Sequence, residues 1–192
     1  MAKKYEFKPD RGPKVLLNRL YLTKKQRLSV LKWSLYALVL LFLSLLQDVL
    51  LVRFRLFGAT TELVPVGIFL ICVLAGVERG SVFSLIAACI YLFSGTAAGT
   101  YCIVFITVIS VFVAYLRQSY LQKGFVPALL CTALGMMLYE TGVFAIGLFL
   151  NQTTPARVIG FGVTTLLSLL AVPALYPITL AIGKIGGEAW KD

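Results

Sequence analysis

The stretch Trp33–Val52, WSLYALVLLFLSLLQDVLLV, decides the fold class of this chain. It holds 20 residues, and Asp48 is the single charged one among them. A helix needs about 20 predominantly apolar residues to cross the roughly 30 Å hydrocarbon core of a bilayer. Within Leu38–Leu46 the apolar residues follow one another directly, whereas a strand of a membrane barrel would alternate apolar and polar residues. The stretch therefore predicts a transmembrane helix.

The whole chain shares this apolar character. Of its 192 residues 59% are hydrophobic and only 14% are charged, whereas charged residues make up about 25% of a soluble domain. Such a composition excludes both a soluble globular protein and a disordered chain. Because lipid satisfies no backbone hydrogen bonds, apolar runs of this kind must be helical. We expect one all-α domain, a polytopic membrane protein.

Six apolar segments divide the chain: Trp33–Val52, Leu63–Val77, Ser81–Phe93, Tyr101–Leu116, Phe125–Leu150 and Val158–Ile182. The second and third are short, so they are either two thinned spans or one re-entrant hairpin that turns at Glu78-Arg79-Gly80. We favour six transmembrane helices, two of them short. The predicted organisation is a basic tail over residues 1–32, a six-helix membrane domain over 33–182 and a short cytoplasmic C-terminus over 183–192.

Basic residues gather at the N-terminal end. Residues 1–32 hold ten Lys or Arg and two acids, so they carry +8 of the total charge of +10. With six spans and a cytoplasmic N-terminus, 15 basic residues fall inside and three outside, as expected because short cytoplasmic loops collect Lys and Arg. The polar lead is also too long for a cleaved signal. We expect both termini on the cytoplasmic side of the membrane.

The second half of the tail, Val15–Leu31, mixes apolar and basic residues. It could form an interfacial helix that binds anionic membrane lipid through four side chains: Arg19, Lys24, Lys25 and Arg27. Alternatively, these charges serve only to set the topology. The tail carries no module that reads nucleic acid, so a nucleic-acid partner is not expected.

Enzymatic chemistry is disfavoured by what the sequence lacks. The chain has no histidine, which removes Ser-His and Cys-His pairs and His-ligated metal or haem sites. Its four cysteines lie in apolar runs and form no C-x-x-C pair, so we read them as packing residues and expect no disulfide, metal or cofactor. The aspartates are too far apart in the chain for an aspartyl protease. We expect a non-enzymatic protein.

Ionisable groups inside the spans are costly and therefore mark candidate functional sites. Asp48 lies near the outer end of the first span, and Glu140 in the outer half of the fifth. Each could serve a cation-coupled carrier, pair with a nearby arginine or bind a partner helix. Tyr91, with Tyr101 and Tyr139, could line a polar cavity beside Glu140, although aromatic residues at such spacings are typical of packing.

One set of short motifs resembles a known family. Leu45-Leu46-Gln47 closes the first span, Arg55-Leu56-Phe57-Gly58 follows it, and Leu92-Phe93-Ser94-Gly95 closes the third. In this layout the chain resembles the MreD family of rod shape-determining membrane proteins. The chain departs from the family where Thr61-Glu62 stands in place of Pro-Asp, Tyr91 in place of an Asp and Ala87 in place of a Gly, and its 32-residue tail is longer than usual. The resemblance implies the bacterial cytoplasmic membrane as the location of the chain.

The resemblance implies a membrane scaffold of the cell-wall elongation machinery, with an MreC-like bitopic protein as its direct partner. Through that partner it would join a RodA-type glycosyltransferase, its penicillin-binding protein and an MreB-like filament. The candidate partner contacts form an outer-facing surface of Asp48, Arg53, Arg55, Leu56, Phe57, Gly58 and Glu62.

The resemblance also carries a second hypothesis, because the family's six-helix arrangement is similar to the S-component, the substrate-binding subunit of energy-coupling-factor vitamin transporters. The alternative function is therefore such a subunit, or another small-molecule carrier. The Ala-x-x-x-Ala signature of those subunits is missing from the first span, which has Ala37 alone.

Overall fold

The computed structural model of the chain describes residues 24–49, 61–95, 97–121 and 124–185, and these are helical, with no strand among them. The α-helices are α2 (Lys24–Val49), α3 (Leu63–Ala75), α4 (Val77–Phe93), α5 (Tyr101–Tyr120), α6 (Phe125–Phe149), α7 (Val158–Leu169) and α8 (Val172–Gly183), and a 3-10 turn, η2 (Pro155–Arg157), precedes α7. The all-α prediction is confirmed for this part of the chain.

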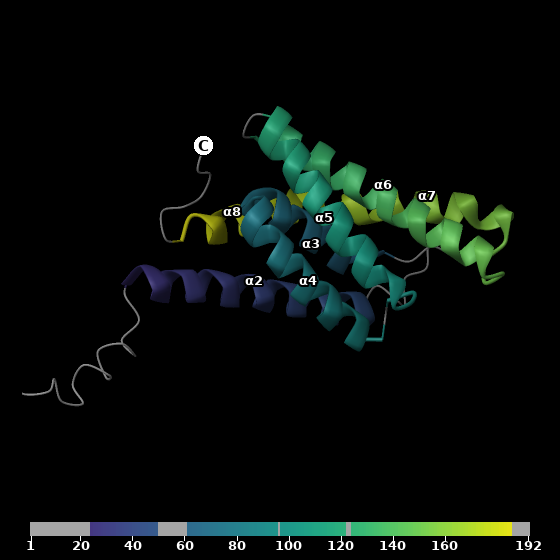
Figure 1. The fold of residues 1–192 in the computed structure, drawn as a ribbon, viewed down its shortest axis with the longest axis horizontal. Helices are drawn as coiled ribbons and strands as arrows, with labels where there is room; N and C mark the ends of the chain where they lie inside the picture. The colour runs from purple at the N-terminus through teal and green to yellow at the C-terminus, as the bar shows by residue number, and fades with distance from the viewer. Residues whose placement is uncertain (1–23, 50–60, 96, 122–123, 186–192) are drawn as a thin grey trace, which may run out of the picture.

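The short helix α3 forms the centre of the bundle (Figure 1). It contacts α2, α4, α5, α6, α7 and α8, and every residue of Leu63–Val73 is buried. A helix that is apolar on all sides has no face suited to water and is stable only when other helices surround it. The sequence LVPVGIFLICVLA is of this kind, which explains why α3 takes the central position.

Successive apolar segments run in alternating directions around α3. A Cβ on Gly67 of α3 would meet the ends of Leu40 and Leu43 of α2, which are in the later part of α2. The Tyr36 hydroxyl in the first half of α2 donates to the Thr179 carbonyl near the end of α8, at 3.2 Å. The start of α2 and the end of α8 therefore lie at the same end of the bundle.

Several helices are long and apolar enough to cross a membrane. This requirement is met individually by Gln26–Val49 of α2, by α5 and by α6. Pro155–Leu169 and Val172–Gly183 meet it as a pair, bent by 46° at the break between them. The helix α3, with 13 residues, is shorter than a span. These helices support the predicted class, a membrane protein.

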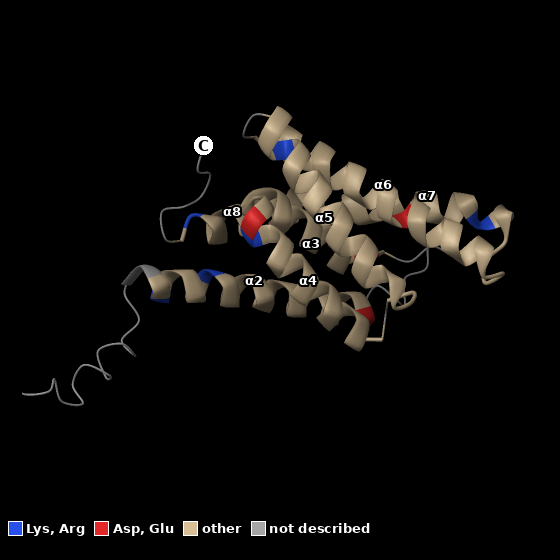
Figure 2. Cartoon of the chain, in the orientation of Figure 1, with Lys and Arg blue, Asp and Glu red and all other residues tan. Residues whose placement is uncertain are grey.

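Charged residues are sparse along the described helices and lie mainly near helix ends. Figure 2 shows Lys and Arg near the start of α2 and at the end of α8, with tan covering most of the length of each helix. Because those two ends share one side of the bundle, the described basic residues there agree with a common, more basic side.

Two elements near the N-terminal half begin elsewhere than the sequence indicates. The helix α2 runs unbroken from Lys24, so Lys24–Leu31 of the possible interfacial helix is continuous with the first apolar segment; residues 15–23 lie outside the described residues. Glu78-Arg79-Gly80 is no turn, because it lies in the first turns of α4. The break falls at Gly76 instead, where a φ of 85° suits a residue without a Cβ.

The predicted segment Val158–Ile182 consists of two helices. It divides at Leu170 and Ala171, between α7 and α8. Pro173 lies in the first turn of α8, where its missing N–H costs nothing, and Pro177 follows inside the helix. The pair of prolines explains why this apolar segment bends.

Candidate functional site

The first turn of α3 is held by polar side chains from two other helices. Gln47 Oε1 of α2 accepts hydrogen bonds from the backbone N–H groups of Leu63 and Val64, at 2.8 and 3.1 Å. Ser168 Oγ of α7 accepts from the N–H of Glu62 at 2.8 Å. Helix N-termini leave such N–H groups without partners, and lipid offers none. These two side chains therefore cap α3 from outside.

The opposite end of α3 is held in the same manner by a cation. Arg117, near the end of α5, donates from Nη1 to the carbonyl oxygen of Val73 at 3.0 Å. A helix carries partial positive charge at its N-terminus and partial negative charge at its C-terminus. With Glu62 at the first end and Arg117 at the other, both ends of α3 face a charge of the favourable sign.

Two buried carboxylates lie close to one another beside this first turn. Oε2 of Glu62 and Oε1 of Glu140 are buried and accept no hydrogen bond, and the two groups interact electrostatically. Between them, Tyr139 interacts with Glu62 and donates from its hydroxyl to Cys102 Sγ at 3.6 Å. Tyr91 is buried in the same neighbourhood. We call Glu62, Tyr91, Tyr139 and Glu140 the carboxylate cluster.

A groove of about 770 Å³ runs between α6 and α7, beside this cluster. We call it the α6–α7 groove; its lining residues are Met137, Glu140, Thr141, Phe144, Val158, Ile159, Phe161, Gly162, Val163, Thr165, Leu166 and Leu169. Phe144 and Phe161 pack edge to face, with ring centroids 5.0 Å apart, and connect the two walls of the groove. Apart from Glu140 and two threonines, the lining is apolar.

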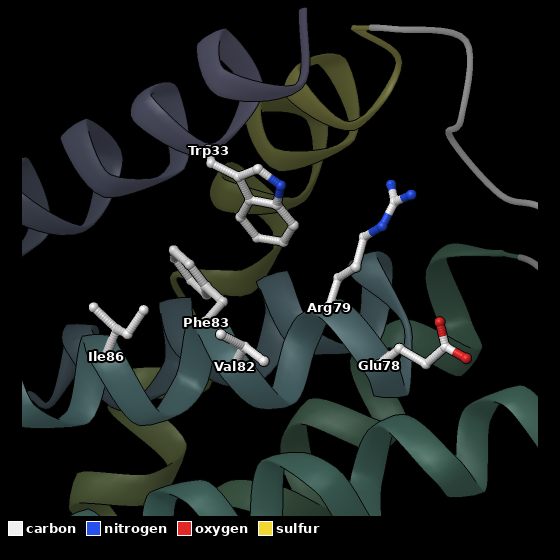
Figure 3. A pocket seen from close by; sticks show the side chains of 6 residues that line it. All are labelled: Trp33, Glu78, Arg79, Val82, Phe83 and Ile86. Atoms are coloured by element: carbon white, nitrogen blue, oxygen red, sulfur yellow. The ribbon is translucent and has the colours of Figure 1, made fainter. Parts of the chain in front are cut away.

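A second, smaller groove of about 410 Å³ lies between α2 and α4 (Figure 3). Trp33 of α2 and Phe83 of α4 face one another across it, with ring centroids 5.3 Å apart. Glu78 and Arg79 lie at the end where α4 begins, and their charged groups extend away from the apolar rings. This arrangement is typical of a helix end at the edge of the hydrocarbon region.

The predicted outer surface is described only in part. Asp48 accepts a 3.5 Å hydrogen bond at Oδ2 from Ser44, while its Oδ1 is buried without a partner. Glu62 is half-buried, and its Oε2 is buried without a hydrogen-bond partner. Arg53, Arg55, Leu56, Phe57 and Gly58 lie outside the described residues.

The predicted lipid-binding side chains are also placed unevenly. Arg27 is exposed on the first turns of α2. Lys24 and Lys25 lie in the same helix, but their side chains, like all of Arg19, lie outside the described part. The two residues of the predicted intramembrane polar site lie in different surroundings. Tyr91 is buried in the core, whereas Glu140 lines the α6–α7 groove.

Sequence reasoning missed the residues that cap α3. Gln47 belongs to one of the motifs of the family resemblance. The sequence pattern predicts no role for Ser168 or Arg117, although each interrupts or borders an apolar segment. A polar residue in an otherwise apolar helix was the available signal, but its partner is remote in the chain: Ser168 binds a residue 106 positions away.

In the described residues no group of three or more His, Cys, Asp or Glu side chains could hold a metal ion. The distinctive features are a carboxylate cluster and an apolar groove that meets it at Glu140. Comparisons with protein-family models, curated proteins and solved structures find no match to this chain.

Proposed function

We propose that this chain is a non-enzymatic scaffold of the bacterial cytoplasmic membrane, similar to MreD, that docks an MreC-like bitopic protein and helps to organise cell-wall elongation. In this proposal the six apolar segments are six spans, with α3 as a short central one and α7 and α8 together as the bent last one. The alternating directions of the described helices support that count.

The observation that carries this proposal is the position of α3. An apolar helix occupies the centre of the bundle, where a carrier needs a polar chamber, and Gln47, Ser168 and Arg117 are engaged in capping it. The two grooves described above lie between neighbouring helices at the flanks. Such a protein offers its sides to other membrane helices, as a scaffold does.

The alternative, a small-molecule carrier such as the substrate-binding subunit of an energy-coupling-factor transporter, has one supporting observation. Two carboxylates interact inside the bundle, and intramembrane carboxylates serve ion-coupled transport in many carriers. Tyr91 and Tyr139, however, are packed in the core and leave no room at their rings for a substrate.

Affinity purification of the tagged full chain from its native membrane in mild detergent tests the proposal. We expect an MreC-like bitopic protein to be recovered with the chain in near-equal amount. Recovery of two ATPases with a large coupling subunit, in its place, would establish the transporter alternative. Depletion of the chain is a second measurement, and we expect rod-shaped cells to become round.

A further inference from the structure

The α6–α7 groove contains a buried carboxyl group with an oxygen that has no hydrogen-bond partner. Glu140 is only 4% exposed, lines the groove and has a buried carboxylate oxygen that accepts no hydrogen bond. It lies nine residues before Phe149, the last residue of α6, and so about 14 Å from that end of the helix. At this depth the surrounding lipid tails provide no hydrogen-bond donor.

The described part of the chain supplies no cation there. None of the described Lys or Arg residues lines the groove, and the group that interacts electrostatically with Glu140 is Glu62, which is also a carboxyl group. Ionisable groups inside membranes are found paired with a group of opposite charge or in contact with water. Within the described residues the groove therefore holds a buried carboxyl group that has no basic partner, and its Oε1 accepts no hydrogen bond.

The walls of the groove have the form that accepts a helix. Met137, Ile159 and Leu166 line it and expose large apolar side chains on its rim. A Cβ added to Gly162 would meet no atom within 4 Å, so the α7 wall is open at that point. Small residues at such positions allow a second helix backbone to approach closely.

From the lining, the depth and the unpartnered carboxyl oxygen together, we infer that the α6–α7 groove docks a transmembrane helix of a partner protein that places a Lys or Arg side chain against Glu140. The inference deepens the proposed scaffold function and rests on it for the premise that the chain binds other helices. It names the chemistry of one docked helix: apolar along its length, with one basic residue in the outer half of the membrane.

Model peptides test this inference without the natural partner. The full chain, with a fluorescent donor fused to its C-terminus, is placed in phosphatidylcholine vesicles with acceptor-labelled Leu-Ala helices of about 24 residues, a span's length. Three peptides carry Lys, Gln or Leu at one position about 14 Å from one end. Energy transfer measured over a lipid dilution series gives each association constant.

We expect the Lys peptide to associate about tenfold more strongly than the Leu peptide, a ratio within the range of polar contacts between membrane helices. Glu140→Gln should remove this preference, and Glu78→Gln, which deletes a carboxylate at the start of α4, should retain it. Gly162→Leu should weaken binding of every peptide by filling the groove. Gly160→Leu is the matched control, because Gly160 is on the same helix, has equally open space and does not line the groove.

Equal association of the Lys and Leu peptides would overturn the inference, as would a Lys preference that survives in Glu140→Gln. Equal association of the Lys and Gln peptides would overturn its cationic part. Because these peptides replace the natural partner, a failure here leaves recovery of an MreC-like protein unaffected. Failure to recover that protein, in turn, leaves the peptide result standing.

Discussion

Replacing Gln47 with leucine should loosen the centre of the bundle. One side-chain oxygen, Gln47 Oε1, accepts from two backbone donors, the N–H groups of Leu63 and Val64, at 2.8 and 3.1 Å, and the residue is only 5% exposed. Leucine is of similar size, so it leaves almost no cavity. The loss is therefore confined to two N–H groups that have neither protein nor water to bond.

The size of the effect follows from those two donors. An unsatisfied buried donor costs about 1–3 kcal/mol in water-soluble proteins. Polar contacts measured inside membranes average about 0.6 kcal/mol and reach about 1.7 kcal/mol, because the unfolded helices also find partners. For two donors we expect the free energy of unfolding to fall by about 1–3 kcal/mol.

Unfolding of the full chain in bicelles, followed by titration with a denaturing detergent, measures this difference. Gln152→Leu provides the matched control, because it makes the same chemical change at an exposed residue after α6 and should leave the unfolding free energy unchanged. If Gln47→Leu unfolds at the same detergent fraction as the unaltered chain, the cap contributes nothing and the account of α3 is wrong.

Three further predictions follow from the same structure. Arg117→Met should lower the free energy of unfolding by about 1.5–3 kcal/mol in the same titration, because a charged donor to the end of α3 is lost, and Arg117→Lys should restore part of it. Gly80→Ala should cost about 1–3 kcal/mol, since its Cβ would lie 3.1 Å from the Cys72 backbone, whereas Gly160→Ala meets open space and should be neutral or slightly stabilising. A cysteine placed at Glu78 should react with a maleimide only from the cytoplasmic side and one at Gln152 only from outside; protection of the first from both sides would indicate a re-entrant hairpin.

The helical class and the positions of most helices could be predicted from the sequence. The segment Phe125–Leu150 differs from α6 by one residue, and Tyr101 begins both the predicted segment and α5. These boundaries were accessible because charges and glycines flank long apolar runs, and the cost of placing them in lipid is large. Local composition was sufficient where a helix ends at the edge of the hydrocarbon region.

Boundaries inside the bundle were harder, because no change of polarity marks them. The break at Gly76 separates two predominantly apolar helices, while the conspicuous charges of Glu78 and Arg79 lie within α4. The bend before Pro173 likewise interrupts a uniformly apolar segment. At these points backbone geometry sets where a helix ends, whereas the sequence pattern indicates only that the segment is apolar.

The polar residues of the bundle could be identified but not assigned to roles. Glu62 is predicted on an outer surface because it begins a segment; in the structure it is half-buried, its Oε2 is enclosed and the next residue, Leu63, is buried. Ser168 and Gln47 acquire their roles through a contact with α3 that depends on the complete packing. A single sequence contains no distance between such residues.

The short length of α3 explains most of these polar groups and singles out Glu140. Thirteen residues extend about 20 Å, against about 30 Å of hydrocarbon, so α3 cannot bring both of its ends to water. Gln47, Ser168 and Arg117 then compensate for that shortness within the protein, and Glu62 lies where the helix dipole favours a negative charge. Glu140 caps no described helix end, and nothing in the architecture of α3 requires it. This carboxyl group, buried at that depth and facing a groove, is the feature for which we propose a partner from outside the chain.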